Sequence, residues 1–299
     1  MNYLSFLWSS RILHFIVAAL IVFFFARRKD RDDSLGTTFD NQNWNLYDVL
    51  VCIFILDFSY IFAQFLKQWH LIQLVVFWAL NFISFYFVFK IKRKESFSSL
   101  CLLKKGICSE VFYGLKIILV FNLFFYGWMQ LSPKPERWLG WSLVYSDLSL
   151  YKDSIYALSF LLILFVLFAP FIEELIFRGL VYTPFRRKAG KWGAIFLSST
   201  VFALYHGQVY NIFGFLFAFM YEKKRSLIPS IVAHSFFSTC QLITYVYLSD
   251  LFDFQYSIKY RDYAKIMFLA CLLLLLAVLF VDKILSINRG RHNVTSFDG

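Results

Sequence analysis

Long apolar runs constrain this chain more than any other feature. Nine stretches are rich enough in apolar residues to be membrane-spanning helices, and most approach the roughly 20 residues that a helix needs to cross a bilayer. Backbone groups in lipid must bond internally, and these runs lack the alternation of a barrel strand. We therefore predict an all-α fold, a polytopic transmembrane bundle of about nine helices. The candidate spans are 11–26, 46–66, 71–90, 107–130, 154–182, 192–206, 210–221, 227–248 and 263–285.

Composition and charge support a membrane location. Of the 299 residues, 60% are hydrophobic and 16% are charged, whereas a soluble domain carries about a quarter charged residues. The net charge of +11 could indicate nucleic-acid binding. The basic residues, however, form short clusters between apolar runs, as cytoplasmic loops do. We therefore predict the lipid bilayer, and no nucleic acid, as a partner.

The basic clusters also predict a topology. With the N-terminus outside and the C-terminus cytoplasmic, every strong Lys/Arg cluster falls in an inside segment. The expected inside segments are 27–45, 91–106, 183–191, 222–226 and 283–299. The expected outside loops are 131–153 and 249–262. The first apolar run lacks a cleavage site, so we expect it to be a retained helix.

Two adjacent carboxylates stand late in the fifth apolar run. Glu174 and Arg178 are four residues apart, so they share a helix face in the favourable order. Glu173 points about 100° away and has no such local partner. Because ionisable groups inside a membrane are costly, this concentration is a functional hypothesis by default.

Two histidines follow in later apolar segments. His206 ends the sixth, and His234 lies in the eighth with Ser238 one turn further along the same face. Alone, each histidine is also typical of a hydrogen-bonded interior residue. Together with Glu173, they match the donors of a zinc centre or of a centre that activates water.

The motifs that contain these residues resemble a known family. Glu-Glu-x-x-x-Arg at 173–178, Phe-x-x-x-His at 202–206 and His-x-x-x-Ser at 234–238 are similar to the CPBP family of intramembrane metalloproteases, also called the Abi family. This family includes the prenyl-protein (CAAX) endopeptidases and bacteriocin-processing proteins. Gly214 and the run at 225–234 follow the same pattern.

The resemblance implies a function and a division of the chain. Residues 154–248 would form the protease core, 1–153 would be transmembrane helices of unassigned role, and 249–299 would be a final helix with a cytoplasmic tail. The substrate would be a membrane-associated protein or peptide. The family's breadth favours a bacterial cell (inner) membrane.

The resemblance also implies roles for the residues. Glu173 would activate water, and His206 and His234 would orient that water or, with Glu173, bind zinc. Glu174 and Arg178 would support the helix.

One catalytic position departs from the family. The family usually has asparagine where this chain has Ser238, and serine offers a developing oxyanion a single, shorter hydroxyl donor. Weaker catalysis, a bridging water and a lack of catalysis all stay open as consequences. Ala218 replaces a second glycine of the pattern, a change that affects helix packing.

Three functional hypotheses therefore stand. The first is a metal-dependent endopeptidase, although a Glu–His pair acting directly on water would use the same residues. The second, favoured by Ser238, is a non-catalytic immunity or sorting factor that binds a peptide or lipidated partner in the same cavity. The third is a transporter, which the concentration of unusual charge in one half disfavours.

Three other polar residues lie in apolar runs. We expect Lys116 to snorkel toward the interface and Asn122 to hydrogen-bond between helices. Asp57 is the hardest to accommodate in lipid and is a candidate for lining the substrate cavity.

Overall fold

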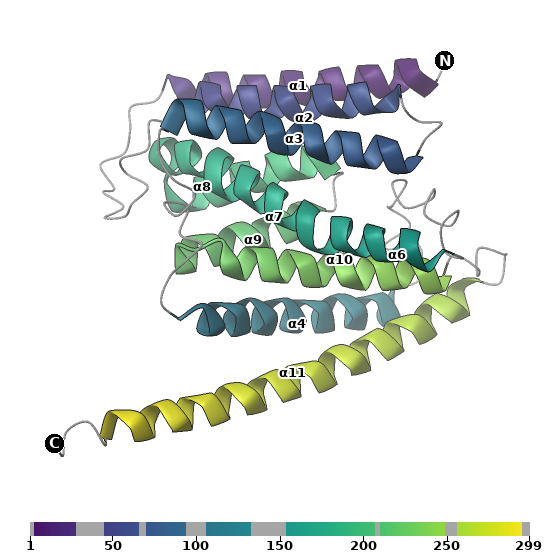
Figure 1. Cartoon of the computed structure of the whole chain (residues 1–299), viewed down its shortest axis with the longest axis vertical. Coiled ribbons are helices and arrows are strands. Elements are labelled where there is room, and N and C mark those ends of the chain that lie inside the picture. Colours follow the sequence, from purple (N-terminus) through teal and green to yellow (C-terminus); the bar gives the residue numbers. More distant parts are fainter. Residues whose placement is uncertain are drawn as a thin grey trace. The chain divides into compact units, whose positions relative to one another are not determined.

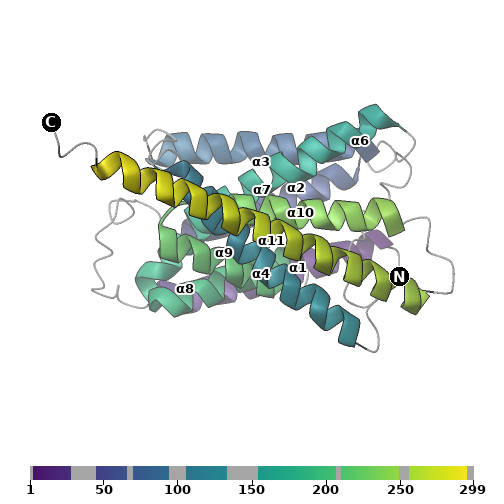
Figure 2. The ribbon, with the colours of Figure 1, turned by 90° about the horizontal axis from the view of Figure 1, so that it is seen from below.

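In the computed structural model (Figures 1 and 2), helices are the only regular secondary structure among the described residues. The described residues are 3–27, 45–65, 70–93, 106–132, 154–206, 210–248 and 256–294. The elements are α1 Tyr3–Ala26, α2 Leu46–Gln64, α3 His70–Arg93, α4 Ile107–Leu131, α6 Ile155–Leu162, η3 Ile163–Phe168, α7 Ala169–Glu174, η4 Leu175–Val181, α8 Tyr182–His206, α9 Tyr210–Lys224, α10 Ile228–Leu248 and α11 Tyr256–Val294.

The predicted helical membrane bundle is confirmed. Each of the nine expected spans falls on helix in the described part of the chain. Among the described residues, three helical stretches are long and apolar enough to cross a membrane, namely Leu46–Ala63, Ile107–Leu131 and Asp262–Ile284. Shorter apolar helices cover Phe15–Ala26, Val75–Tyr86 and Ile228–Ile243. The expected outside loop 131–153 lies almost wholly outside the described residues, whereas residues 256–262 of the expected loop 249–262 are helical and belong to α11.

The helix that carries the two glutamates is irregular. Two π-helical stretches, η3 and η4, flank α7. Pro170 at the start of α7 has no N–H, and its ring would clash with the carbonyl four residues earlier in a regular α-helix. The widened turns of η3 immediately before it accommodate this clash, as π-bulges do.

Gly190 divides α8 into two helical parts. Its φ of 74° and ψ of −176° lie in a region that is essentially restricted to glycine. The expected fifth and sixth spans are therefore separated by a backbone break inside one continuous run of helical residues.

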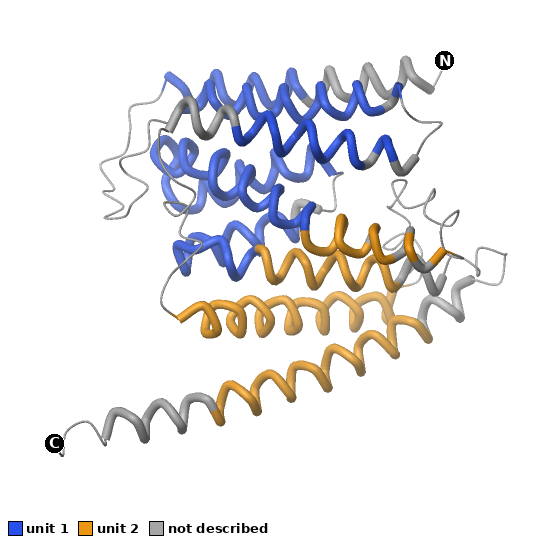
Figure 3. Tube along the Cα trace, in the orientation of Figure 1, with its two compact units in different colours: residues 1–104, 168–230 blue, residues 105–167, 231–299 orange. Residues whose placement is uncertain are grey.

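The helices form two compact units, each built from two stretches of chain (Figure 3). Unit 1 contains residues 1–104 and 168–230, and unit 2 contains residues 105–167 and 231–299. In unit 1, α1, α2 and α3 lie side by side, and α8 contacts α9, η4, α1 and α2 (Figure 1). The division by role into 1–153, 154–248 and 249–299 remains a prediction.

Unit 2 is centred on the packing of α4 against α11. Its core includes Tyr126 and Tyr263, whose rings meet edge-to-face. Asn122 donates a hydrogen bond to the Cys240 Sγ of α10, which confirms the expected interhelical bond. Lys116, which we expect to snorkel, forms an ion pair in which its Nζ lies 2.7 Å from the Asp282 carboxylate of α11.

Large apolar side chains cover the outer surface of both units. On α11 these exposed residues include Leu269, Leu273, Leu276 and Phe280. Water would disfavour such a surface, whereas lipid solvates it. The exposed faces therefore support the assignment of a membrane bundle.

Candidate active site

Glu173 and His206 come together inside unit 1. Glu173 lies on α7 and His206 ends α8, and the Glu173 Oε2 is 3.0 Å from the His206 Nε2. The Glu173 side chain is 7% exposed and that of His206 is 19% exposed. A carboxylate and an imidazole from separate helices thus meet in a largely dehydrated place.

The backbone of α8 orients the His206 ring. The ring Nδ1 lies 3.1 Å from the Phe202 carbonyl oxygen one turn earlier. Because a carbonyl can only accept, this hydrogen bond puts the ring hydrogen of a neutral imidazole on Nδ1. The lone pair of Nε2 then faces Glu173. Packing against the Phe202 ring, with centroids 4.2 Å apart, also restrains the imidazole.

This orientation makes the pair suited to holding a cation. A carboxylate oxygen and an imidazole lone pair repel each other unless a proton or a metal ion lies between them. Metal-binding histidines commonly donate their other ring N–H to a backbone carbonyl, as His206 does. The pair therefore fits both a shared proton and two ligands of zinc. Among the described residues, no three His, Cys, Asp or Glu side chains gather as a metal-binding group.

A buried ion pair stabilises the helix next to Glu173. The Arg178 Nε lies 3.2 Å from the Glu174 carboxylate, and neither side chain is more than 1% exposed. Arg178 also donates to the Gly214 carbonyl of α9 at 2.9 Å. Its guanidinium lies 4.7 Å from the centroid of the Phe202 ring. Arg178 thus links η4 to α9 and packs on the residue whose carbonyl orients His206.

Gly214 is required for the close approach of α8 and α9. A Cβ at this position would lie 3.0 Å from a Phe202 ring carbon and 3.3 Å from the Ser199 Cα. Both distances are tighter than ordinary van der Waals contact. The missing side chain therefore brings the Gly214 carbonyl within reach of Arg178.

His234 and Ser238 lie in unit 2. They are one turn apart on α10, and both are buried, with 6% exposure each. The structure therefore brings Glu173, Glu174, Arg178 and His206 together in unit 1, and His234 with Ser238 in unit 2. Ala218, which replaces the second glycine of the family pattern, is fully buried on α9.

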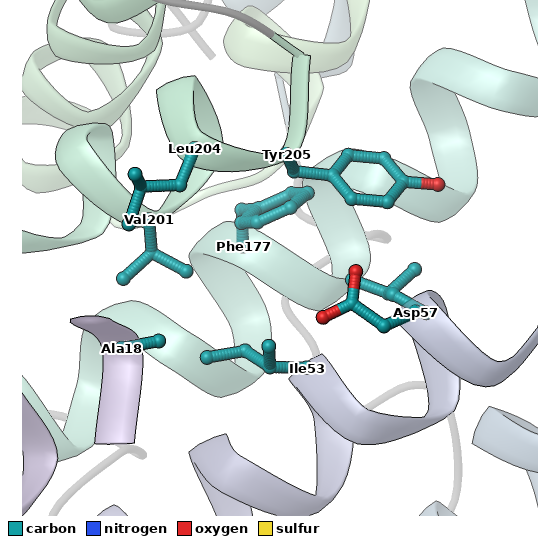
Figure 4. A pocket seen from close by; sticks show the side chains of 8 residues that line it. Ala18, Ile53, Asp57, Phe177, Val201, Leu204 and Tyr205 are labelled. Carbon is teal, nitrogen blue, oxygen red and sulfur yellow. The ribbon is translucent and has the colours of Figure 1, made fainter. Parts of the chain in front are cut away.

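A cavity in unit 1 adjoins the Glu173–His206 pair. It is lined by α1, α2, η4 and α8, and Asp57 is its one charged lining residue (Figure 4). Phe177 and Tyr205 line the cavity and also pack against His206, with ring centroids 6.2 and 4.7 Å from the imidazole. Sequence reasoning missed these two aromatic residues, because Phe and Tyr recur throughout the chain.

Part of the chain matches a known protease family. Residues 155–240 match the type II CAAX prenyl endopeptidase Rce1-like family. The matched segment contains Glu173, His206, His234 and Ser238.

A curated relative points the same way. The chain is 29% identical over 96 residues to a Bacillus subtilis (strain 168) protein named "Putative membrane peptidase YdiL". This match covers 30% of the chain and 39% of that protein, so the chain spans well under half of the relative's length. No solved structure matches the chain. Residues 155–240 are therefore similar to the family of the type II CAAX prenyl endopeptidases.

Proposed function

We propose that this chain is an intramembrane endopeptidase that hydrolyses a peptide bond of a membrane-associated protein or peptide. The observation that carries the proposal is the 3.0 Å contact between Glu173 and His206. Both residues lie in the segment that matches the endopeptidase family. The membrane we propose is the bacterial inner membrane, with the N-terminus outside and the C-terminus cytoplasmic.

Glu173 is the proposed general base. Its carboxylate takes a proton from water as the water oxygen attacks the peptide carbonyl, and then delivers a proton to the leaving amine. His206, oriented by the Phe202 carbonyl, shares the proton or orients the water. Burial strengthens these electrostatic interactions, because little water competes for the groups.

The other predicted residues complete the proposed site. From the order of the motifs alone, we assign His234 the same role as His206, which is to orient the water or to bind a metal. We assign Ser238 the role of hydrogen-bond donor to the oxyanion. Glu174 and Arg178 are positioning residues, since their ion pair fixes the helix segment that carries Glu173.

We propose zinc as the cofactor of this site, from the chemistry of its candidate ligands. Glu173, His206 and His234 would hold it, because carboxylate and imidazole groups are ordinary zinc ligands. A bound zinc ion polarises a carbonyl and activates water. We expect about one zinc per purified chain, and we expect His206→Ala/His234→Ala to lose it. Absence of zinc from folded wild-type protein would favour a metal-free Glu–His site.

Substitution of Glu173 tests the proposed activity. Purified protein in lipid nanodiscs is incubated with a proteome-derived peptide library, and new peptide termini are counted by mass spectrometry. We expect Glu173→Gln to remove cleavage, because the amide cannot accept the proton of water. Glu222→Gln is the matched control, since Glu222 is another buried glutamate of unit 1 and bonds Tyr182, Arg186 and Arg225 instead.

The same experiment distinguishes the alternative function. Ser238 in place of the family's asparagine favours a non-catalytic factor that binds a peptide or lipidated partner. In that case the wild-type protein would generate no new peptide termini. Library peptides would still co-purify with both the wild type and Glu173→Gln. Cleavage that persists undiminished in folded Glu173→Gln would contradict the endopeptidase assignment.

A further inference from the structure

The cavity beside the Glu173–His206 pair has an unusual lining. Seven of its eight lining residues are apolar or aromatic, and the eighth is Asp57. Counted with its open mouth, the cavity has an empty volume of about 290 Å³. The lining residues come from α1, α2, η4 and α8 of unit 1. The cavity thus belongs to one compact unit.

Asp57 presents a buried carboxylate to this cavity. It lies in the middle of the apolar helix α2 and is 8% exposed. Figure 4 shows its carboxylate directed into the space below Phe177 and Tyr205. A carboxylate has about four lone-pair sites, so it can accept from a ligand in addition to its existing contacts. Asp57 also lies outside the segment that matches the family.

Apolar walls and one carboxylate define the chemistry of a ligand. An aliphatic chain gains from contact with the walls, and a positively charged end gains from the carboxylate. Lysine combines these features, with an apolar stem and a terminal ammonium. None of the eight lining residues is basic, so the lining itself provides no positive charge to pair with the carboxylate.

The position of the cavity connects it to the proposed reaction. Phe177 and Tyr205 form a wall shared with the His206 imidazole. Phe177 is also one helical turn beyond Glu173. A side chain in the cavity would therefore lie next to the groups that act on the peptide bond.

We propose that this cavity is a substrate subsite that binds a basic, lysine-type side chain, with Asp57 as the residue that determines this preference. The inference rests on the proposed endopeptidase function and specifies its substrate. Asp57 acts on binding through charge and is not a catalytic residue.

The test uses two peptides that differ only in the ammonium group. The full chain, in nanodiscs of zwitterionic phosphatidylcholine, is titrated with acetyl-Leu-Lys-Leu-amide and acetyl-Leu-norleucine-Leu-amide, and Kd values are corrected with empty nanodiscs. We expect the lysine peptide to bind about tenfold more tightly, as charge-assisted pairing predicts. Asp57→Asn keeps the shape of the side chain and should abolish this difference.

A second carboxylate on α2 supplies the control. Asp48 is equally buried, but it forms the capping box with Asn45 and does not line the cavity. Asp48→Asn keeps an acceptor oxygen for the cap and should retain the lysine preference. Equal binding of both peptides by wild-type protein, or a preference that survives in Asp57→Asn, would overturn the proposal.

Failure of the subsite and failure of the function give different results. Cleavage that depends on Glu173, without any lysine preference, would reject the subsite alone. An Asp57-dependent preference without any cleavage would reject the endopeptidase and leave a cavity that binds basic side chains. Glu173→Gln should retain the preference in either case.

Discussion

At the scale of single residues, unit 1 holds two kinds of buried charge. Arg178 and Glu174 satisfy each other, and the Gly214 carbonyl and aromatic rings surround the guanidinium. Glu173 faces the His206 nitrogen, a group that can also bind a proton or a metal. The first arrangement fixes structure, whereas the second is suited to chemistry.

Arg178→Met should strongly destabilise the protein. The substitution leaves the Glu174 carboxylate buried without its cation, and breaking a buried pair in this way costs about 3–5 kcal/mol. The free energy of unfolding, measured by titration with a denaturing detergent, tests this. The exposed pair of Lys265 with Asp262 offers the control, and Lys265→Met should change stability by less than about 1 kcal/mol. A small change in Arg178→Met would contradict the structural role of the pair.

The sequence predicts the ionisable residues of the candidate site but not the aromatic residues that pack around them. Glu173 and His206 stand out because charged and titratable groups are rare in apolar helices. Phe177 and Tyr205 are two among 39 Phe and 18 Tyr residues, so composition does not distinguish them. The hydrogen bond from Arg178 to the Gly214 carbonyl also has no sequence pattern, because any residue provides a carbonyl.

At the scale of helices, hydropathy predicts where elements lie better than how they are built. The expected spans fall on helices because a helix satisfies backbone groups in lipid and the apolar length is set by the bilayer. The expected span 263–285 becomes the longer α11, since a helix can continue beyond its apolar part. The π-helical turns beside α7 escape prediction, because they depend on hydrogen-bond register and not on hydrophobicity.

Gly214→Ala should destabilise unit 1 by about 1–3 kcal/mol, because overpacking separates α8 from α9. The loss should appear in unfolding titrations and should be accompanied by a lower cleavage rate, since Arg178 bonds the Gly214 carbonyl. Gly127→Ala is the control. Its Cβ would make only ordinary contact, at 3.6 Å from Phe268, and helix propensity favours alanine. Equal effects of the two substitutions would contradict the close-approach argument.

At the scale of the whole molecule, the family match covers only part of the chain around the candidate site. Residues 155–240 contain the matched motifs, yet α1 and α2 lie outside them and still line the cavity with Asp57. The N-terminal helices therefore contribute to the surroundings of the candidate site. Their sequence alone assigns them to the membrane and marks Asp57 as a candidate for lining a cavity.

The predicted topology places residue 34 inside and residue 142 outside. Ser34→Cys and Ser142→Cys are introduced separately into a chain whose five native cysteines are replaced by serine. A membrane-impermeant maleimide applied to intact spheroplasts should label the cysteine at 142, and should label the one at 34 only after permeabilisation. The reverse pattern would contradict the topology based on positive charge.

The most direct test of the central claim is whether Glu173 and His206 act as one hydrolytic unit. Values of kcat/KM are measured in nanodiscs for the wild type, Glu173→Gln, His206→Ala and the double variant, on a peptide that the wild type cleaves. We predict that each single substitution lowers kcat/KM by about a thousandfold. We also predict that kcat/KM of the double variant is no lower than that of the less active single variant. Losses that multiply in the double variant, or full activity in Glu173→Gln, would contradict a shared Glu173–His206 centre.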